Sequence, residues 1–158
     1  MRSRIFQLST ERLPKDEWID EISISDADMG YYGIDYYGET ETYEEDLKHL
    51  AEILPKEVFK VEGNKITILS DGSCLFEQYK KELLEMVQEM DFNSFLNTAP
   101  FKIKEKAKKI IPTDYLFYIQ DWGGYLETSN ALIEYAANAV REGKPKELYI
   151  NGILYYHT

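Results

Sequence analysis

The sequence predicts one α+β domain, in which a mixed and largely antiparallel sheet of about five or six strands is packed by about four or five helices. Runs of strand length flank turn residues at 63–64 and 151–152, which is typical of β-hairpins. Other segments carry apolar residues at helical spacing. The chain of 158 residues is 44% hydrophobic, which suffices for one core, so residues 1–158 are interpreted as a single domain.

The first third of the chain predicts one strand and two helices. Residues 3–8 mix β-branched, aromatic and leucine side chains over the length of a strand. Pro14 suits the first turn of a short helix. A longer helix is expected to begin at Thr42 or Tyr43, because the leucines that follow recur at helical spacing, and Pro55 should end it.

The middle of the chain predicts a hairpin followed by helices. Gly63 and Asn64 separate two β-branched runs within residues 58–69. Residues 71–73 should cap a long helix, which has an apolar stripe. The members of that stripe are Phe76, Tyr79, Leu83, Met86, Val87 and Met90. Residues 101–110 then predict a short, lysine-rich amphipathic helix that ends before Pro112.

The last third predicts a buried strand, a helix and a second hairpin. Residues 115–120 are apolar enough for a central strand, and the glycine-rich turn at 121–124 follows. A helix should begin at Thr128 or Ser129 and end at Gly143. The Asn-Gly pair at 151–152 lies between two apolar runs, so we expect a hairpin there.

The charge of the chain is unevenly distributed. The net charge is −11, from 29 acidic and 18 basic residues. Residues 11–52 contain 14 acids and three bases, whereas residues 53–158 are close to balanced. A net charge of −11 disfavours binding to nucleic-acid phosphates and to an anionic membrane, because both attract clustered lysine and arginine. We therefore expect neither partner. The charge asymmetry indicates a charged interaction surface, and we expect residues 26–46 within the acidic segment to form it.

The acidic segment is also rich in tyrosine. Its glycines and paired aromatics between residues 30 and 46 favour a loop or a short irregular strand over a helix. Tyrosine gives large contact area at low entropic cost, and carboxylates steer a basic protein toward its binding site. The candidate binding residues are Tyr31, Tyr32, Asp35, Tyr36, Tyr37, Glu39, Glu41, Tyr43, Glu44 and Glu45.

These features predict a non-enzymatic protein that binds a basic partner protein. The partner could be a toxin or enzyme that is held inactive, as by an inhibitor or immunity protein, or a nucleic-acid-binding protein whose phosphate site is mimicked by carboxylates. An acidic surface that only maintains solubility is the competing explanation. The lysines at 102–109 are interpreted as a solvated helix face or as a contact for the acidic segment of a second copy, which would give a homo-oligomer.

A small enzyme is the alternative function, with a pocket near Trp122–Tyr125, near Cys74, or near Asp46 and His49. Cys74 should begin a helix, where a thiol becomes nucleophilic, although a lone cysteine is more often a small buried residue. A dinuclear site would need a second Glu-x-x-His pair, which the chain lacks. We therefore expect no catalytic residue, no metal and no cofactor.

The expected compartment is the cytoplasm. One cysteine excludes an intramolecular disulfide. The apolar run after Arg2 and Arg4 is shorter than the core of a signal peptide, and no apolar stretch has the length of a membrane span.

Overall fold

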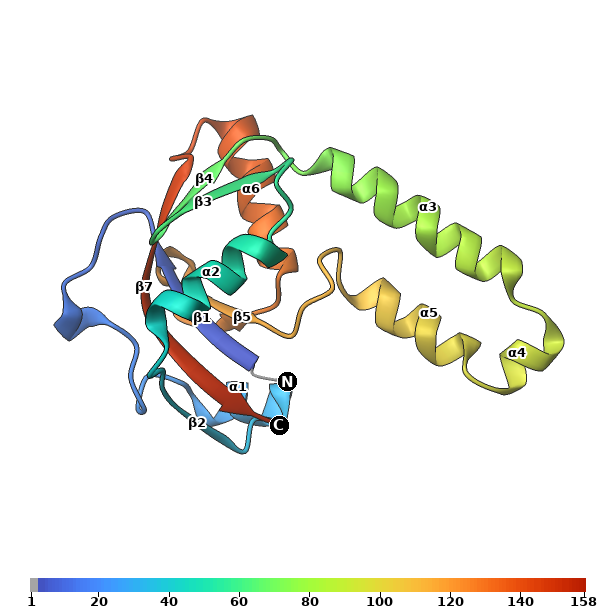
Figure 1. The fold of residues 1–158 in the computed structure, drawn as a ribbon, viewed down its shortest axis with the longest axis horizontal. Coiled ribbons are helices and arrows are strands. Elements are labelled where there is room, and N and C mark those ends of the chain that lie inside the picture. Colours follow the sequence, from blue (N-terminus) through green and yellow to red (C-terminus); the bar gives the residue numbers. More distant parts are fainter. Residues whose placement is uncertain (1–2) are drawn as a thin grey trace.

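The computed structural model describes residues 3–158, so Arg2, one base of the basic start, lies outside the described residues. It confirms the α+β class, with a sheet of seven strands and six α-helices (Figure 1). The strands are β1 (Ser3–Ser9), β2 (Tyr36–Glu39), β3 (Phe59–Glu62), β4 (Lys65–Ile68), β5 (Leu116–Ile119), β6 (Leu126–Glu127) and β7 (Glu147–His157). The helices are α1 (Asp26–Tyr32), α2 (Tyr43–Ile53), α3 (Ser73–Glu89), α4 (Phe92–Leu96), α5 (Ala99–Lys108) and α6 (Asn130–Glu142), with 3₁₀ helices at Lys15–Glu17 and Gln120–Trp122.

The sheet is built around the long strand β7. The strand order is β3-β4-β7-β1-β5-β6, and β2 pairs with the C-terminal part of β7. Only β1 and β5 run parallel, and the other described pairs are antiparallel. The predicted first hairpin is confirmed, since Glu62 pairs with Lys65 across a turn in which Gly63 has φ +58°.

The predicted hairpin at residues 151–152 is wrong, because β7 continues through both residues as one strand. The pairing with β1 shifts register there, from Phe6 opposite Ile153 to Leu8 opposite Ile150, which makes a β-bulge. Gly152 N donates to Gln7 Oε1 at 3.1 Å. The Asn-Gly pair therefore bends a central strand instead of reversing the chain.

The core has two parts, one on each face of the sheet. Alternate residues of β1 point to opposite faces, as strand geometry requires. Phe6 and Leu8 pack in the main cluster with α2 and α6. Ile5 packs in a smaller cluster with Ile24 and Ile34, which flank α1. The segment around the predicted site is thus held on the sheet by its own small core.

Residues 26–32 form a helix, which corrects the expectation of a loop or short irregular strand for residues 30–32. Ser25 caps α1 by accepting a hydrogen bond from Asp28 N at 3.1 Å, and Gly33 ends it at φ +66°. The caps and the apolar contacts of Met29 offset the weak helix propensity of Gly30. The short strand expected in this segment is present as β2.

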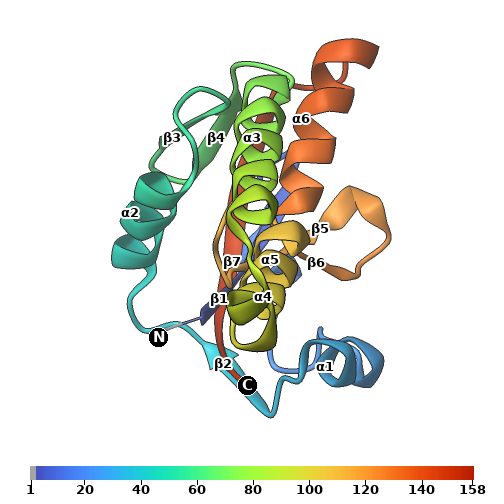
Figure 2. The same ribbon diagram turned by 90° about the vertical axis from the view of Figure 1, so that its right-hand side faces the viewer.

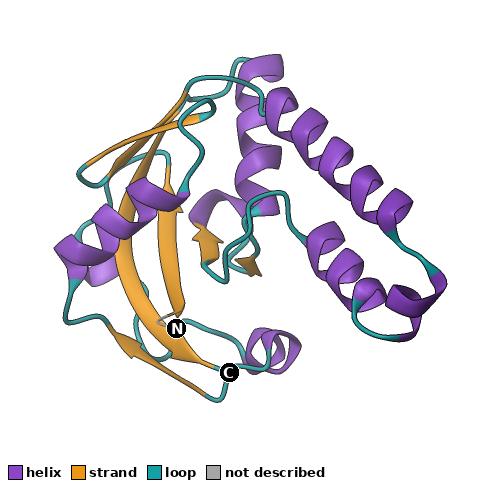
Figure 3. Cartoon of the chain, turned by 45° about the vertical axis from the view of Figure 1, so that its right-hand side comes forward, coloured by secondary structure: helices purple, strands orange, loops and turns teal. Residues whose placement is uncertain are grey.

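Helices α3, α4 and α5 project from the rest of the molecule as an arm, defined here as residues 73–108 (Figures 1 and 3). Seen from the end of the arm, α3 and α5 run together in front of the sheet and α4 closes the far end (Figure 2). The long helix predicted after residue 72 is confirmed. None of the three arm helices contains a buried residue, so the apolar stripe of α3 is not part of the core.

Candidate functional site

The candidate tyrosines divide into structural and exposed residues. Tyr32 donates a hydrogen bond to Leu126 O at 2.9 Å, and Tyr37 donates to Glu21 O. Tyr43 donates to Asn151 O at 2.8 Å. These three tyrosines are half-buried, so their rings are largely unavailable to a partner. Tyr32 and Tyr43 hold α1 and α2 on the sheet, and Tyr37 connects β2 to the loop before α1.

Burial changes the titration of two of these structural tyrosines. Desolvation raises the pKa of Tyr32 and that of Tyr43 to about 12, since burial disfavours the phenolate. Nearby acids add to the effect, chiefly Glu127 for Tyr32 and Glu44 for Tyr43. Both phenols therefore stay protonated donors at neutral pH.

Two candidate tyrosines are exposed. Tyr31 lies on α1 with 82% of its surface exposed. Tyr36 lies on β2, 54% exposed, and its hydroxyl accepts a hydrogen bond from that of Tyr155 at 3.1 Å. Tyr155, on β7, was not among the sequence candidates. Its position opposite Gly38 follows from strand pairing between distant segments, which local sequence does not reveal.

The five candidate carboxylates are all exposed, and we call this set the acidic face: Asp35, Glu39, Glu41, Glu44 and Glu45. They lie on the continuous segment that includes β2, the β2–α2 connection and the first turn of α2. Asp46, the next acid in this segment, is buried and serves a different role.

A buried ion pair fixes the β2–α2 connection. Arg4 Nε lies 2.9 Å from Asp46 Oδ1, and both side chains are almost fully buried. The Nε–H is not directed at an acceptor, so the contact is an ion pair without a well-aligned hydrogen bond. The hydroxyls of Thr40 and Thr42 donate to Asp46 Oδ2. Arg4 thereby neutralises Asp46 and leaves the five carboxylates of the acidic face uncompensated by this cation.

Two hollows flank the β2–α2 connection, and Glu39 and Thr40 line both. The Trp18 hollow, of about 570 Å³, also includes Trp18 and Asp16. Its Trp18 ring stacks on Tyr43 with centroids 5.6 Å apart, and Trp18 Nε1 donates to Leu13 O. Lys15, which also lines this hollow, has its Nζ 5.7 Å from the centroid of the Trp18 ring. The aromatic wall beside carboxylates therefore already holds a cationic side chain of this chain, which a cationic side chain of a partner would displace.

The Tyr155 hollow lies on the other side of the connection and has a volume of about 630 Å³. Glu39, Glu41 and Tyr155 line it, together with Arg4 and His157. Both hollows therefore combine exposed carboxylates with aromatic side chains, which is the combination that sequence reasoning proposed for the segment as a whole.

The residues of the enzyme hypothesis are placed in three separate parts of the fold. A hollow of about 380 Å³ lies beside Asp46 and His49, and Tyr115 also lines it. Asp46 is held by Arg4, and exposed His49 is 3.6 Å from Glu52. Among residues 3–158, no group of three or more histidine, cysteine or carboxylate residues is arranged to hold a metal ion.

The other two enzyme candidates are a turn and an exposed thiol. Trp122 packs against Tyr135 with centroids 6.0 Å apart, and Gly124 has φ +78° with Tyr118 beside it. Cys74, the second residue of α3, is exposed, which corrects the expectation of a small buried residue. Apart from Leu75, which contacts the main core cluster, this helix packs on α5.

Arg4 and Trp18 are, besides Tyr155, the site residues that sequence reasoning missed. Arg4 directly precedes the apolar pair Ile5 and Phe6 in β1, which is a signal for a buried ion pair, but the partner on α2 cannot be identified without the fold. Trp18 follows the first 3₁₀ helix, whose position was predicted but whose contact with Tyr43 was not.

Comparison with known proteins yields no relative, since the chain matches no family model, no curated protein and no solved structure. Within residues 3–158 there is no helix with the length and apolar character needed to cross a membrane.

Proposed function

We propose that this chain is a non-enzymatic interaction protein that binds a basic partner protein through the acidic face. The observation that carries the proposal is the pair of hollows that share Glu39, each lined by exposed carboxylates and an aromatic ring. Lysine or arginine side chains of the partner would enter these hollows, and Tyr36 and Tyr31 would contribute exposed contact area.

The carboxylates would act first on the rate of association. Several exposed like charges on one continuous segment attract an oppositely charged protein over a distance of about a Debye length, roughly 8–10 Å at physiological salt. The hydrogen bonds from Thr40 and Thr42 to the buried Asp46, which pairs with Arg4, would keep these charges in place. An inhibitor, an immunity protein or a mimic of nucleic-acid phosphates would each use this arrangement, and the partner would carry a compact basic site.

The proposal is tested by partner capture at low salt. The variant replaces the acidic face with amides (Asp35→Asn with Glu39→Gln, Glu41→Gln, Glu44→Gln and Glu45→Gln). A matched control replaces the same number of exposed acids elsewhere (Glu57→Gln, Glu62→Gln, Glu77→Gln, Glu85→Gln and Glu89→Gln). The proposal expects wild type and control to retain the same basic protein from a lysate and the variant to lose it.

Equal retention by variant and control would contradict the proposal, because the two chains carry the same net charge. It would indicate that the acids of residues 11–52 serve solubility.

A further inference from the structure

Both ends of the arm are anchored to the rest of the chain, which we call the body. Where the chain enters α3, Leu75 packs against the main core cluster and Asp71 lies 3.7 Å from Arg141 of α6. Where the chain leaves α5, Lys109 Nζ donates to Thr113 O and to Asp114 Oδ1, both at 2.9 Å.

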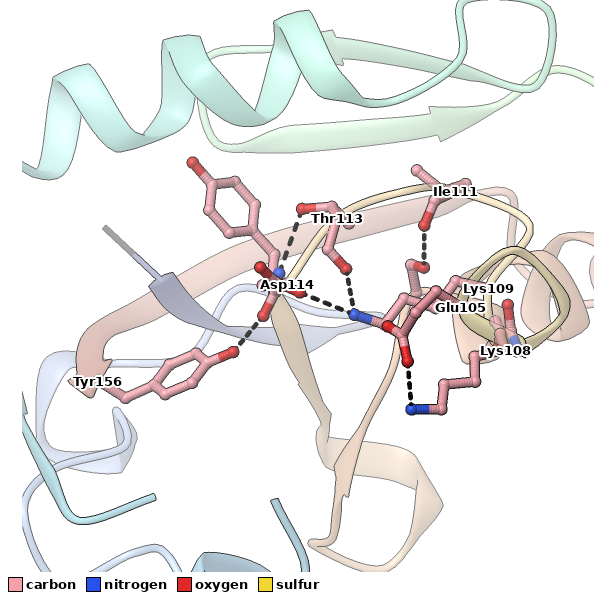
Figure 4. A network of polar contacts seen from close by, with 10 residues as sticks. Glu105, Lys108, Lys109, Ile111, Thr113, Asp114 and Tyr156 are labelled. Atoms are coloured by element: carbon pink, nitrogen blue, oxygen red, sulfur yellow. Dashed lines mark hydrogen bonds and ion pairs between the residues drawn. The ribbon is translucent and has the colours of Figure 1, made fainter. Parts of the chain in front are cut away.

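Further hydrogen bonds hold the end of the arm at which the chain leaves α5. Tyr156 of β7 donates to Asp114 O, and Ser129 Oγ donates to Ile111 O at 3.0 Å (Figure 4). Asn130 Nδ2 at the start of α6 donates to Lys108 O at 2.8 Å. The arm is therefore held in a defined direction, and its far end is presented away from the body.

The distal half of the arm exposes large apolar side chains. Phe92 is 75% exposed and Leu96 is 62% exposed, and neither residue packs against a core cluster. We call the set of exposed apolar residues in the distal half of the arm the apolar tip: Leu84, Val87, Phe92, Phe95, Leu96 and Phe101. Six large apolar side chains exposed to water in one part of a molecule mark an interaction site.

The charge of the arm differs from that of the body. Residues 73–108 contain six acidic and six basic residues, so the remainder of the chain carries the whole net charge of −11. Within the arm, α5 holds four lysines and one glutamate. Phe101, Lys104 and Lys108 recur at helical spacing and share one exposed face of α5. The arm thus presents apolar and cationic groups together.

We infer that the apolar tip and the lysines of α5 form the docking surface for the acidic face of a second copy of this chain. Charge complementarity selects this occupant, because exposed lysines of α5 would meet the exposed Glu39 and Glu41. The aromatic residues of the tip would occupy the Trp18 hollow and the surface around Tyr36, where apolar and acidic groups also lie together.

Each copy has one arm and one acidic face. In a dimer with a two-fold axis, the arm of each copy can therefore contact the acidic face of the other. Lys102 and Lys104 belong to no ion pair among the residues that the structure describes, which leaves them free to pair across this interface. The inference does not require a foreign partner, although it uses the same acidic face as the proposed function.

The test is a charge exchange between two full-length variants. The arm variant carries Lys102→Glu and Lys104→Glu, and the face variant carries Glu39→Lys and Glu41→Lys. Sedimentation velocity at low salt should give wild-type dimers, about twice 18.5 kDa, whereas each variant alone should be monomeric because like charges meet at both interfaces. An equimolar mixture of the variants should dimerise again, since both interfaces of the mixed pair are complementary.

A second pair of variants tests the apolar part. Phe92→Ser with Phe95→Ser should abolish the wild-type dimer while the circular dichroism spectrum is unchanged, because both side chains are exposed. Val140→Ser, also exposed but on α6 outside the arm, should leave the dimer intact.

Monomeric wild type at all concentrations would overturn the inference. A face variant that dimerises alone like wild type would also overturn it, because the arms would then pair with each other. Failure of the mixture to dimerise would do the same. These results are distinguishable from failure of the proposed function, since a monomer can still capture a basic protein and a dimer can capture none.

Discussion

The buried pair between Arg4 and Asp46 sets the shape of the site. Arg4 is 5% exposed and Asp46 is 3% exposed, and the charge of each is compensated by the other. Removing one partner of such a pair leaves a buried charge without compensation, which costs far more than the pair contributes. The two threonine hydroxyls bound to Asp46 would lose their acceptor as well.

We expect Asp46→Ala to lower the free energy of unfolding by about 3–5 kcal/mol, the usual cost of breaking a buried ion pair. Urea unfolding followed by tryptophan fluorescence measures this change. Glu45→Ala is the matched control, because Glu45 precedes Asp46 on the same helix but is exposed, and a change within about 0.5 kcal/mol is expected. Similar losses in both variants would contradict the structural role of the pair.

The buried tyrosines predict a loss of stability at alkaline pH. The pKa of Tyr32 and that of Tyr43 are raised from 10.0 to about 12 in the folded chain. The folded state holds these protons more tightly than the unfolded state, so this stability is fully present below pH 10 and is lost as the pH rises through 12. The free energy of unfolding should fall across this window, and Tyr43→Phe should reduce the fall. A free energy that is flat up to pH 12 would contradict the burial of these phenols.

The individual elements differ in how far the sequence predicted them. Strand β1, the first hairpin and helices α2, α3 and α6 follow from local patterns of apolar residues, caps and proline. The Asn-Gly pair at 151–152 gave a wrong hairpin, because turn propensity is a local property. Here pairing of β7 with β1, β2 and β4 overrides it and keeps both residues within one strand.

Local packing predicts opposite effects for two glycine substitutions, one at Gly152 in the bulge of β7 and one at Gly30 in α1. A Cβ at Gly152 would lie 3.0 Å from Ile19 Cγ1 and 3.1 Å from Ile19 N, so Gly152→Ala should destabilise the chain by about 1–3 kcal/mol. A Cβ at Gly30, inside α1, would meet nothing within 4 Å, and Gly30→Ala should stabilise by about 0.5–1 kcal/mol. Thermal unfolding of both variants measures the difference, and a Gly152→Ala variant as stable as wild type would contradict the close contact between the bulge and Ile19.

At the scale of the whole molecule, the acidic face and the arm are separate features. The sequence placed the acidic charge correctly in residues 11–52, because charge can be counted, but it could not say which tyrosines are exposed. The apolar stripe of α3 was equally ambiguous, since the same periodicity describes a helix on a core and a helix in a projecting arm. Only the fold separates the two.

The most direct test of whether the acidic face binds another chain is zero-length carbodiimide crosslinking, because this reagent joins a carboxylate to a lysine that contacts it. Applied to the full chain in a lysate, it should link Glu39, Glu41 and their neighbours on the acidic face to lysines of another polypeptide chain. In the proposed function, those lysines belong to a basic protein. In the inferred dimer, they are Lys102 or Lys104 of a second copy. Intermolecular links spread evenly over exposed acids such as Glu57 and Glu62, or absent from the acidic face, would contradict the account.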